Sequence, residues 1–359
     1  DISSVTNWNV AASPYLITQS ITINNILNID AGVHILLKKL DDGNRVYLNV
    51  NYNGALNASG VSGNPVVFKS SATDPEKSYW GHIRFEQVYK DSTLTYCEIS
   101  HAETAISIGY NSGDSVTINN CTITHNDRGI NSDGSSPTIS SNTIKDNNSP
   151  IYISGGTPII SGNSFTENAN RIELEQTKAS FTNNTVENNS STGINVNGNN
   201  GNRPSIEYNV IKNNNGYGVY LEYQGADLKG NTIANNGSSG IYYRNQDQYG
   251  TTFPLITENS IADNNSYGIY LEGCPTCTQD WDKGYPKAVI NNNSLYDNYQ
   301  GDIYNGSEHE IDARNNYWGD YTTNKMDQGS NPKDLNAIYD YYDSNANGTV
   351  NYAAWLDSE

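Results

Sequence analysis

Three tyrosines in the second half of the chain belong to a pattern that suits the recognition of sugars. Tyr220, Tyr242 and Tyr270 each lie between apolar residues that alternate with period two, so we expect their rings to face solvent. Two positions after these tyrosines come a carboxylate, a guanidinium group and a second carboxylate, on Glu222, Arg244 and Glu272. Aromatic faces stack on sugar rings, and charged groups form directional hydrogen bonds with hydroxyls. The pattern is compatible with a glycan-binding stripe.

Two inserted loops leave the chain directly after this stripe, over residues 245–254 and 273–288. Loops in these places could wall a groove that contains the stripe, with Tyr249 and Trp281 at its rim. A purely structural role fits the same residues. In that role, stacked tyrosines stabilise neighbouring strands and the charged residues form an ordinary surface ladder.

The two carboxylates also permit a hydrolase. Glu222 and Glu272 would lie two coils apart, about 9.6 Å by backbone rise, a separation compatible with an inverting glycosidase. Arg244, between them in the sequence pattern, is the third catalytic candidate. A lyase would instead need Lys, Arg or His to neutralise a uronate carboxylate and abstract a proton, and the exposed columns contain few of these residues.

The four cysteines form two pairs with different expectations. Cys97 and Cys121 occupy the same repeat position in adjacent coils, so their Cα atoms should lie about 5 Å apart, which permits a disulfide. Two stacked free thiols in a buried column are the alternative. Cys274 and Cys277, in Cys-Pro-Thr-Cys on the longest inserted loop, predict a local disulfide that stiffens the loop rather than a redox pair.

A run near the end of the chain matches the start of a calcium-binding loop. Asp343, Asn345 and Asn347 occupy alternate positions before a glycine. Position twelve is Ala354 rather than a bidentate glutamate, so we favour a polar turn and keep calcium as the alternative. No other cofactor is indicated.

These residues are positioned by a repeat, Asn-x-apolar-x-x-Asn followed by Gly-apolar-x-apolar, which recurs from Leu94 onward. Its first position is occupied in turn by Cys97, Cys121, Asn142, Asn163, Asn184, Asn209, Asn231, Asn259, Asn293 and Asn315. Successive members are 21 to 25 residues apart, except for intervals of 28 and 34 that contain the two loops. The first-position side chains should therefore stack into a ladder.

Two columns of apolar residues follow each ladder position, and the second of them begins at Ile106. The first consists of Ile99, Ile123, Ile144, Phe165, Val186, Ile211, Ile233, Ile261, Leu295 and Tyr317, which we expect to point inward. Period-two spacing indicates strands, and Gly and Asn at the corners tolerate left-handed backbone conformations. Helical and leucine-rich repeats would need other spacings. The chain is predicted to be an all-β parallel β-helix solenoid with about 22 residues per coil.

Composition and the chain ends limit the remaining possibilities. The net charge of −19 argues against nucleic acid as a partner, and no apolar run of about 18 residues predicts membrane insertion. Because the chain starts at Asp1, we expect a processed, soluble protein that is secreted or displayed at the cell surface. We predict an N-terminal cap over residues 1–20, the β-helix over 21–319 and a C-terminal cap over 320–359, since an uncapped end invites polymerisation.

The Asn-x-Ile repeats end in residues 314–319, Arg-Asn-Asn-Tyr-Trp-Gly, and the whole resembles the pectin-lyase-like right-handed β-helix superfamily over about residues 16–320. The resemblance implies a right-handed solenoid. Members include pectate lyases, polygalacturonases, alginate-modifying enzymes and surface proteins without known catalysis, so the fold leaves the activity open. The Asp-Pro-His-Asp motif of alginate epimerases and the Asn-Thr-Asp and Gly-His-Gly motifs of polygalacturonases do not occur.

Three functions are compatible with these observations. We favour a noncatalytic extracellular or cell-surface scaffold, adhesin-like, that binds glycan along the Tyr/Glu stripe or contacts a neighbouring surface protein. A secreted polysaccharide hydrolase or lyase is the first alternative. A structural subunit that self-assembles into an extracellular filament is the second.

Overall fold

The computed structural model describes residues 1–40, 43–110, 112, 115–199, 201–245, 253–275 and 285–358. The chain divides into two compact units, an N-terminal unit of residues 1–173 and 177–180 and a C-terminal unit of residues 174–176 and 181–359. Strands β21 (Ile172–Glu175) and β22 (Ser180–Thr182) contain the points of division. Each unit is described by itself.

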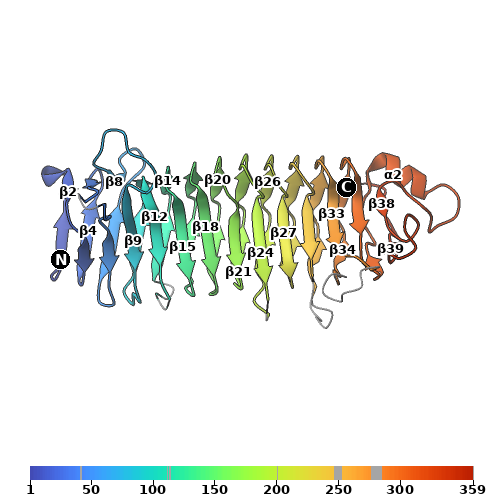
Figure 1. Cartoon of the computed structure of the whole chain (residues 1–359), viewed down its shortest axis with the longest axis horizontal. Helices are drawn as coiled ribbons and strands as arrows, with labels where there is room; N and C mark the ends of the chain where they lie inside the picture. Colours follow the sequence, from blue (N-terminus) through green and yellow to red (C-terminus); the bar gives the residue numbers. More distant parts are fainter. Residues whose placement is uncertain are drawn as a thin grey trace. The chain divides into compact units, whose positions relative to one another are not determined.

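The N-terminal unit consists of three parallel sheets (Figure 1). A short 3-10 helix, η1 (Val10–Ala12), lies between the first two strands. In order, the first sheet contains β1 (Thr6–Trp8), β4 (Ile26–Asp30), β7 (Ala55–Ser59), β10 (Ser92–Thr95), β13 (Val116–Asn119), β16 (Thr138–Ser140) and β19 (Ile159–Ser161). The second contains β2 (Tyr15–Ile17), β5 (His34–Leu37), β8 (Val66–Ser70), β11 (Cys97–Ser100), β14 (Thr122–Thr124), β17 (Thr143–Lys145) and β20 (Ser164–Thr166). The third contains β3 (Ile21–Ile23), β6 (Leu48–Val50), β9 (Trp80–Phe85), β12 (Ala102–Ile108), β15 (Arg128–Asp133) and β18 (Ser149–Ser154).

The C-terminal unit repeats this arrangement and adds one helix, α2 (Gly319–Met326). Its first sheet contains β25 (Ser205–Glu207), β28 (Asp227–Lys229), β31 (Leu255–Thr257), β34 (Val289–Asn291), β37 (Ile311–Asp312) and β39 (Val350–Asn351). The second contains β23 (Thr185–Glu187), β26 (Val210–Lys212), β29 (Thr232–Ala234), β32 (Ser260–Ala262) and β35 (Ser294–Tyr296). The third contains β24 (Ile194–Gly198), β27 (Val219–Tyr223), β30 (Ile241–Arg244), β33 (Tyr267–Glu272), β36 (Gly301–Asn305) and β38 (Ile338–Tyr339).

Stacked apolar columns form the core of each unit. Ile118, Ile139 and Ile160 pair in register on adjacent strands of the first sheet and are fully buried. The strand interiors alternate buried and more exposed positions, as period two requires. The predicted parallel β-helix is confirmed, with about 24 residues per coil where the repeat predicted about 22.

The buried asparagines form the predicted ladder within each unit. In the N-terminal unit, the backbone N–H and the side-chain amide of Asn142 both donate to Asn163 Oδ1, each at 2.9 Å. The same amide also donates to the carbonyl of Ile118 at 3.0 Å. In the C-terminal unit, Asn209 and Asn231 repeat the arrangement. Each rung thus supplies partners to backbone groups that a corner would otherwise leave unpaired.

The last rung of the ladder differs from the prediction by one residue. Asn293 donates to Asn316 Oδ1, not to Asn315, and Asn315 has a φ of 59°. In the preceding coils, too, a left-handed residue comes just before the rung, as Asn292 (φ 58°) comes before Asn293. Two adjacent asparagines can fill either role. The shift puts the fully buried Trp318 in the inward position predicted for Tyr317, which is half-buried.

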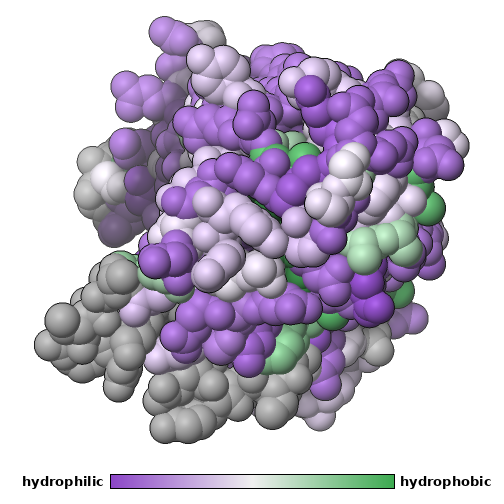
Figure 2. Space-filling model, turned by 90° about the vertical axis from the view of Figure 1, so that its right-hand side faces the viewer, coloured by the Kyte–Doolittle hydropathy of each residue, from purple (hydrophilic) through white to green (hydrophobic). Residues whose placement is uncertain are grey.

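Helix α2 and strands β38 and β39 end the C-terminal unit. Met326 of the helix and Val350 of β39 are buried. Figure 2 shows this end of the unit as a largely hydrophilic surface with small apolar areas. Among the described residues, no helix combines the length and the apolar character needed to cross a bilayer.

Candidate functional site

Five tyrosines form one row on the third sheet of the C-terminal unit. Tyr220, Tyr242, Tyr270, Tyr304 and Tyr339 pair in register on β27, β30, β33, β36 and β38. The centroids of successive rings are 5.0, 5.1, 4.3 and 4.7 Å apart, and the interplanar angles are 7°, 3°, 2° and 15°. The spacing of the repeat therefore places the first three as predicted, and the row continues over two further coils. We call these five residues the tyrosine row.

Parallel stacking changes what the tyrosine row can offer a ligand. Each interior ring is covered on both faces by its neighbours, so the predicted stacking of sugar rings on these faces is wrong for the interior of the row. Tyr217 and Tyr267 lie against the row as tilted rings, with Tyr217 4.6 Å from Tyr242. The half-buried row therefore presents ring edges and hydroxyl groups to solvent.

A column of alternating charges accompanies the tyrosine row. Glu222 pairs in register with Arg244, which pairs in register with Glu272. Arg244 Nε lies 3.3 Å from Glu272 Oε2, and the two side chains are 41% and 37% exposed. The Tyr220 hydroxyl donates to Glu222 Oε1 at 3.2 Å. The predicted polar partners are thus brought together with the tyrosines.

The surroundings keep the tyrosine hydroxyls protonated. Burial, followed by the nearby Glu222 carboxylate, raises the pKa of Tyr220 to about 12. Burial and a hydrogen bond to Glu272 raise the pKa of Tyr242, and burial and Tyr304 raise the pKa of Tyr270. A neutral phenol both donates and accepts hydrogen bonds, so Tyr220, Tyr242 and Tyr270 each offer both functions at physiological pH.

A cation lies between the two carboxylates that were predicted as a catalytic pair. An inverting glycosidase needs space for a water molecule between its acid and its base. Here Arg244 lies in register between Glu222 and Glu272 and is paired with the second of them. Tyr249 and Trp281, predicted to line a groove over the row, lie outside the described residues.

The two cysteine pairs have different outcomes. Cys274 takes part in a disulfide bond, whereas its predicted partner Cys277 lies outside the described residues. Cys97 and Cys121 are free and buried, so the disulfide predicted between them is not formed. Each thiol replaces an asparagine amide in the ladder and points at backbone carbonyls, since Cys121 Sγ lies 3.4 Å from Leu94 O. Burial and the neighbouring Cys121 raise the pKa of the Cys97 thiol.

The predicted calcium segment forms a hydrogen-bonded turn. Asp343 Oδ2 accepts from the backbone N–H of Asp340 at 3.0 Å, and the N–H of Asn347 donates to Ser344 O at 2.9 Å. In the part of the chain that the structure describes, no group of three or more His, Cys, Asp or Glu residues could hold a metal ion. Calcium at Asp343, Asn345 and Asn347 stays a prediction.

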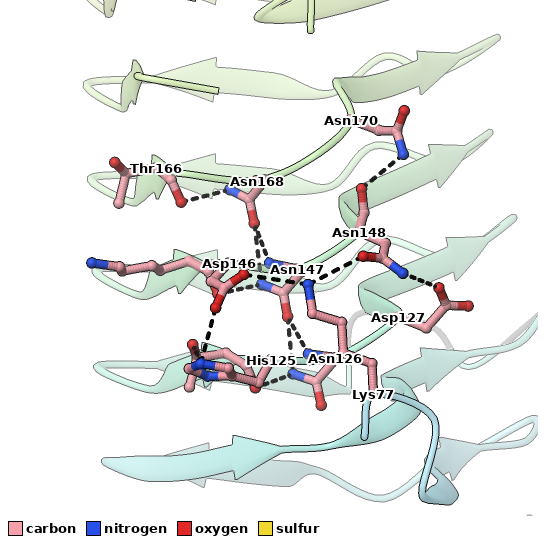
Figure 3. A network of polar contacts seen from close by, with 12 residues as sticks. Lys77, His125, Asn126, Asp127, Asp146, Asn147, Asn148, Thr166, Asn168 and Asn170 are labelled. Atoms are coloured by element: carbon pink, nitrogen blue, oxygen red, sulfur yellow. Dashed lines mark hydrogen bonds and ion pairs between the residues drawn. The ribbon is translucent and has the colours of Figure 1, made fainter. Parts of the chain in front are cut away.

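The N-terminal unit carries a polar cluster that the sequence analysis missed (Figure 3). His125 Nε2 lies 2.9 Å from Asp146 Oδ2. Lys77 Nζ reaches the same carboxylate at 3.3 Å and Asn148 Oδ1 at 3.1 Å. His101 stacks on His125 with ring centroids 5.7 Å apart. Burial, then His125 and Lys69, lower the pKa of His101, which favours its neutral form.

A repeat signal could have found part of this cluster. His101, His125 and Asp146 each follow a first-position residue by four, and all three have left-handed backbone conformations with φ of 64°, 57° and 52°. Their shared offset places them in one column. Lys77 lies 69 residues before Asp146, in the segment between β8 and β9, and no repeat predicts its position.

Three family models match parts of the chain. A right-handed β-helix region matches residues 81–229, a pectate-lyase-like β-helix domain matches residues 3–86, and the periplasmic copper-binding protein family NosD matches residues 157–333. No curated protein matches the chain significantly. The matched segments together cover most of the repeat.

Solved structures with a similar course of the chain include a mutant of the periplasmic alginate epimerase AlgG, at 13% identity and a TM-score of 0.48, over 87% of this chain and 83% of that one. A mannuronic-acid-specific family 6 polysaccharide lyase from the human gut microbiota matches at 13% identity and 0.46, over 87% and 79%. The catalytic domain of a GH87 α-1,3-glucanase with nigerose matches at 11% identity and 0.40, over 98% and 64%.

The copper named by the third family does not fit the residues present. Copper sites use thiolate, thioether and imidazole ligands. Within residues 157–333 the chain offers only Cys274, Cys277, His309 and Met326. Cys274 is disulfide-bonded and Met326 is fully buried. We therefore derive no copper chemistry for this chain.

Proposed function

The chain belongs to the pectin-lyase-like right-handed β-helix superfamily. We propose that it is a noncatalytic extracellular or cell-surface member that binds glycan along the tyrosine row. The ligand lies along the exposed edge of the row and crosses several coils. The ring edges line it, and the hydroxyls hydrogen-bond to it.

One observation carries this proposal, the regular row of phenol hydroxyls with charged partners beside it. Successive rings are 4.3 to 5.1 Å apart, so the row presents hydroxyl groups at regular intervals along several coils. Sugars present alternating donors and acceptors, which the hydroxyls and the Glu222 carboxylate can match. Two glutamates and a net charge of −19 disfavour acidic polymers, so the proposed ligand is a neutral glycan.

A polysaccharide lyase is the second candidate, favoured by the N-terminal cluster. His101 and His125 could serve as a base, and Lys77 supplies a positive charge nearby. Both His125 and Lys77 already engage Asp146, which is why we rank this function below glycan binding. Filament formation stays a third possibility, and electron microscopy of native material tests it.

A panel of neutral and acidic polysaccharides separates these functions. We expect the full chain to be retarded in affinity gels that contain neutral polysaccharide, without release of reducing ends or of unsaturated products. Gels with acidic polymers should give no retardation, because the net charge opposes their binding. Release of unsaturated products that is lost in His125→Ala would replace the proposal with a lyase. Release of reducing ends that is lost in Glu222→Gln would replace it with a hydrolase.

A further inference from the structure

A second candidate site lies in the C-terminal unit, between strand β35 and helix α2. It is a pocket of about 540 Å³, a volume typical of small-molecule sites. Three tyrosines and two aspartates line it, namely Tyr296, Tyr317, Tyr321, Asp297 and Asp320. We call this the tyrosine pocket. None of its residues belongs to the tyrosine row.

The local fold explains how these side chains come together. Asn316, the last rung, and Trp318 are both buried, whereas Tyr317 between them is half-buried and makes an isolated bridge to Ser294. Gly319 has a φ of 72°, and a Cβ at this position would lie 2.8 Å from Tyr296 Cβ. The backbone can pass this close to Tyr296 only as glycine. Helix α2 begins at Gly319 and carries two of the lining residues, Asp320 and Tyr321.

The rings in the tyrosine pocket are inclined to each other, unlike those of the row. The centroids of Tyr296 and Tyr317 lie 6.2 Å apart at an interplanar angle of 59°. Two rings set as a V can both turn their faces toward a third group, which parallel stacked rings cannot do. The Tyr317 hydroxyl donates to Asp320 Oδ1 at 2.7 Å, which holds one ring and one carboxylate in place.

The charges around the tyrosine pocket indicate which kind of ligand group it can bind. The negative faces of aromatic rings attract cations, and two carboxylates strengthen that attraction. Lys325 Nζ lies 5.7 Å from the centroid of the Tyr321 ring, which shows that this ring can accept a cation over its face. The pocket repels anions, and a neutral sugar would gain little from the second carboxylate. We infer that the tyrosine pocket binds an organic cation with an alkylammonium or quaternary ammonium group.

Calorimetric titration of the full chain with choline tests this inference. The matched neutral probe is 3,3-dimethylbutan-1-ol, which has the shape of choline but no charge. We expect choline to bind at least about tenfold more tightly than the alcohol, since cation–π and carboxylate attraction act only on the cation. Tyr317→Ala and Tyr321→Ala should each weaken choline binding about five- to tenfold.

An exposed test position and a matched control position make the titration interpretable. Tyr321 is 70% exposed, so Tyr321→Ala tests the ring without touching the core. Tyr299 is 81% exposed and does not line the pocket, so Tyr299→Ala should leave choline binding unchanged. Equal affinity for choline and the alcohol, no binding of choline, or an undiminished affinity in Tyr321→Ala would each overturn the inference. Substitutions in the tyrosine row should leave choline binding intact, so this site and the proposed glycan site fail independently.

Discussion

Replacing Asp302 with asparagine is expected to stabilise the C-terminal unit at pH 8 by roughly 2–4 kcal/mol. Asp302 is 4% exposed, and burial raises the pKa of its carboxyl group to about 7. The amide of Asn298, whose Oδ1 accepts from the Asn264 amide, donates to Asp302 Oδ1 at 2.9 Å and offsets this rise in pKa only in part. The ordinary pKa of 3.8 sets an upper limit of about 4 kcal/mol on the destabilisation. An asparagine has nearly the same shape, accepts the same hydrogen bond and needs no ionisation.

The sign of the pH dependence follows from the raised pKa. Between pH 4 and 7 the folded chain keeps a proton on Asp302 that the unfolded chain has lost. The contribution of this group is therefore fully present below about pH 4 and lost as the pH rises to about 7. Urea unfolding of the wild type and the variant at pH 4, 6 and 8 measures it. The difference in unfolding free energy should be smallest at pH 4 and grow with pH.

The matched control is Asp263→Asn, at an exposed corner with a φ of 55° that asparagine also tolerates. It should change the unfolding free energy by less than about 0.5 kcal/mol at every pH. A stabilisation by Asp302→Asn that does not vary with pH, or a destabilisation at pH 8, would contradict this account of the buried carboxyl.

Removing one rung of the ladder should have the opposite and largest effect, a loss of about 3–5 kcal/mol for Asn231→Ala. Asn231 is 1% exposed. Its Oδ1 accepts from both the N–H and the amide of Asn209, each at 2.9 Å. Its amide donates to Ile206 O at 2.8 Å and to Asn259 Oδ1 at 2.9 Å. Alanine removes the acceptor of the buried Asn209 N–H and the side-chain donor to Ile206 O, whereas the Asn209 amide keeps Phe181 O and Glu207 O as acceptors. Urea unfolding at pH 7 measures the cost.

Asn265→Ala is the control for the ladder. Asn265 is exposed, and its amide donates to Gly237 O at 3.5 Å. This weak bond should be worth less than about 0.5 kcal/mol. If the two alanine variants lost the same stability, the ladder would be a consequence of the fold and not one of its main supports.

The sequence predicted the fold and the register of the site because both follow from one repeat. Residues at the same offset in successive coils are neighbours, so the spacing of Tyr220, Tyr242 and Tyr270 was enough to place them side by side. The same rule holds for the paired thiols. The rule says which residues are neighbours, but not how two side chains orient. It therefore could not show that the rings cover each other's faces or that Cys97 and Cys121 stay unbonded.

Other features depend on contacts that no repeat encodes. Asn315 and Asn316 can each serve as rung or corner, and the structure uses Asn316 as the rung, with Trp318 buried two residues later. Lys77 reaches Asp146 from a segment outside the regular strands. The tyrosine pocket exists because the chain leaves the repeat at Gly319 and folds back as a helix. In each case tertiary contacts determine a feature that the spacing of residues in the sequence does not.

The proposed glycan site is tested most directly by removing the hydroxyls of the tyrosine row while keeping its rings. The variant Tyr220→Phe, Tyr242→Phe, Tyr270→Phe preserves the stacking, and a matched control replaces the exposed Tyr110, Tyr299 and Tyr321 with phenylalanine. Both are titrated against the neutral polysaccharide that retards the wild type most. Three lost hydrogen bonds predict binding at least about tenfold weaker in the first variant and unchanged in the control. Equal affinity of the wild type and the row variant would contradict the account.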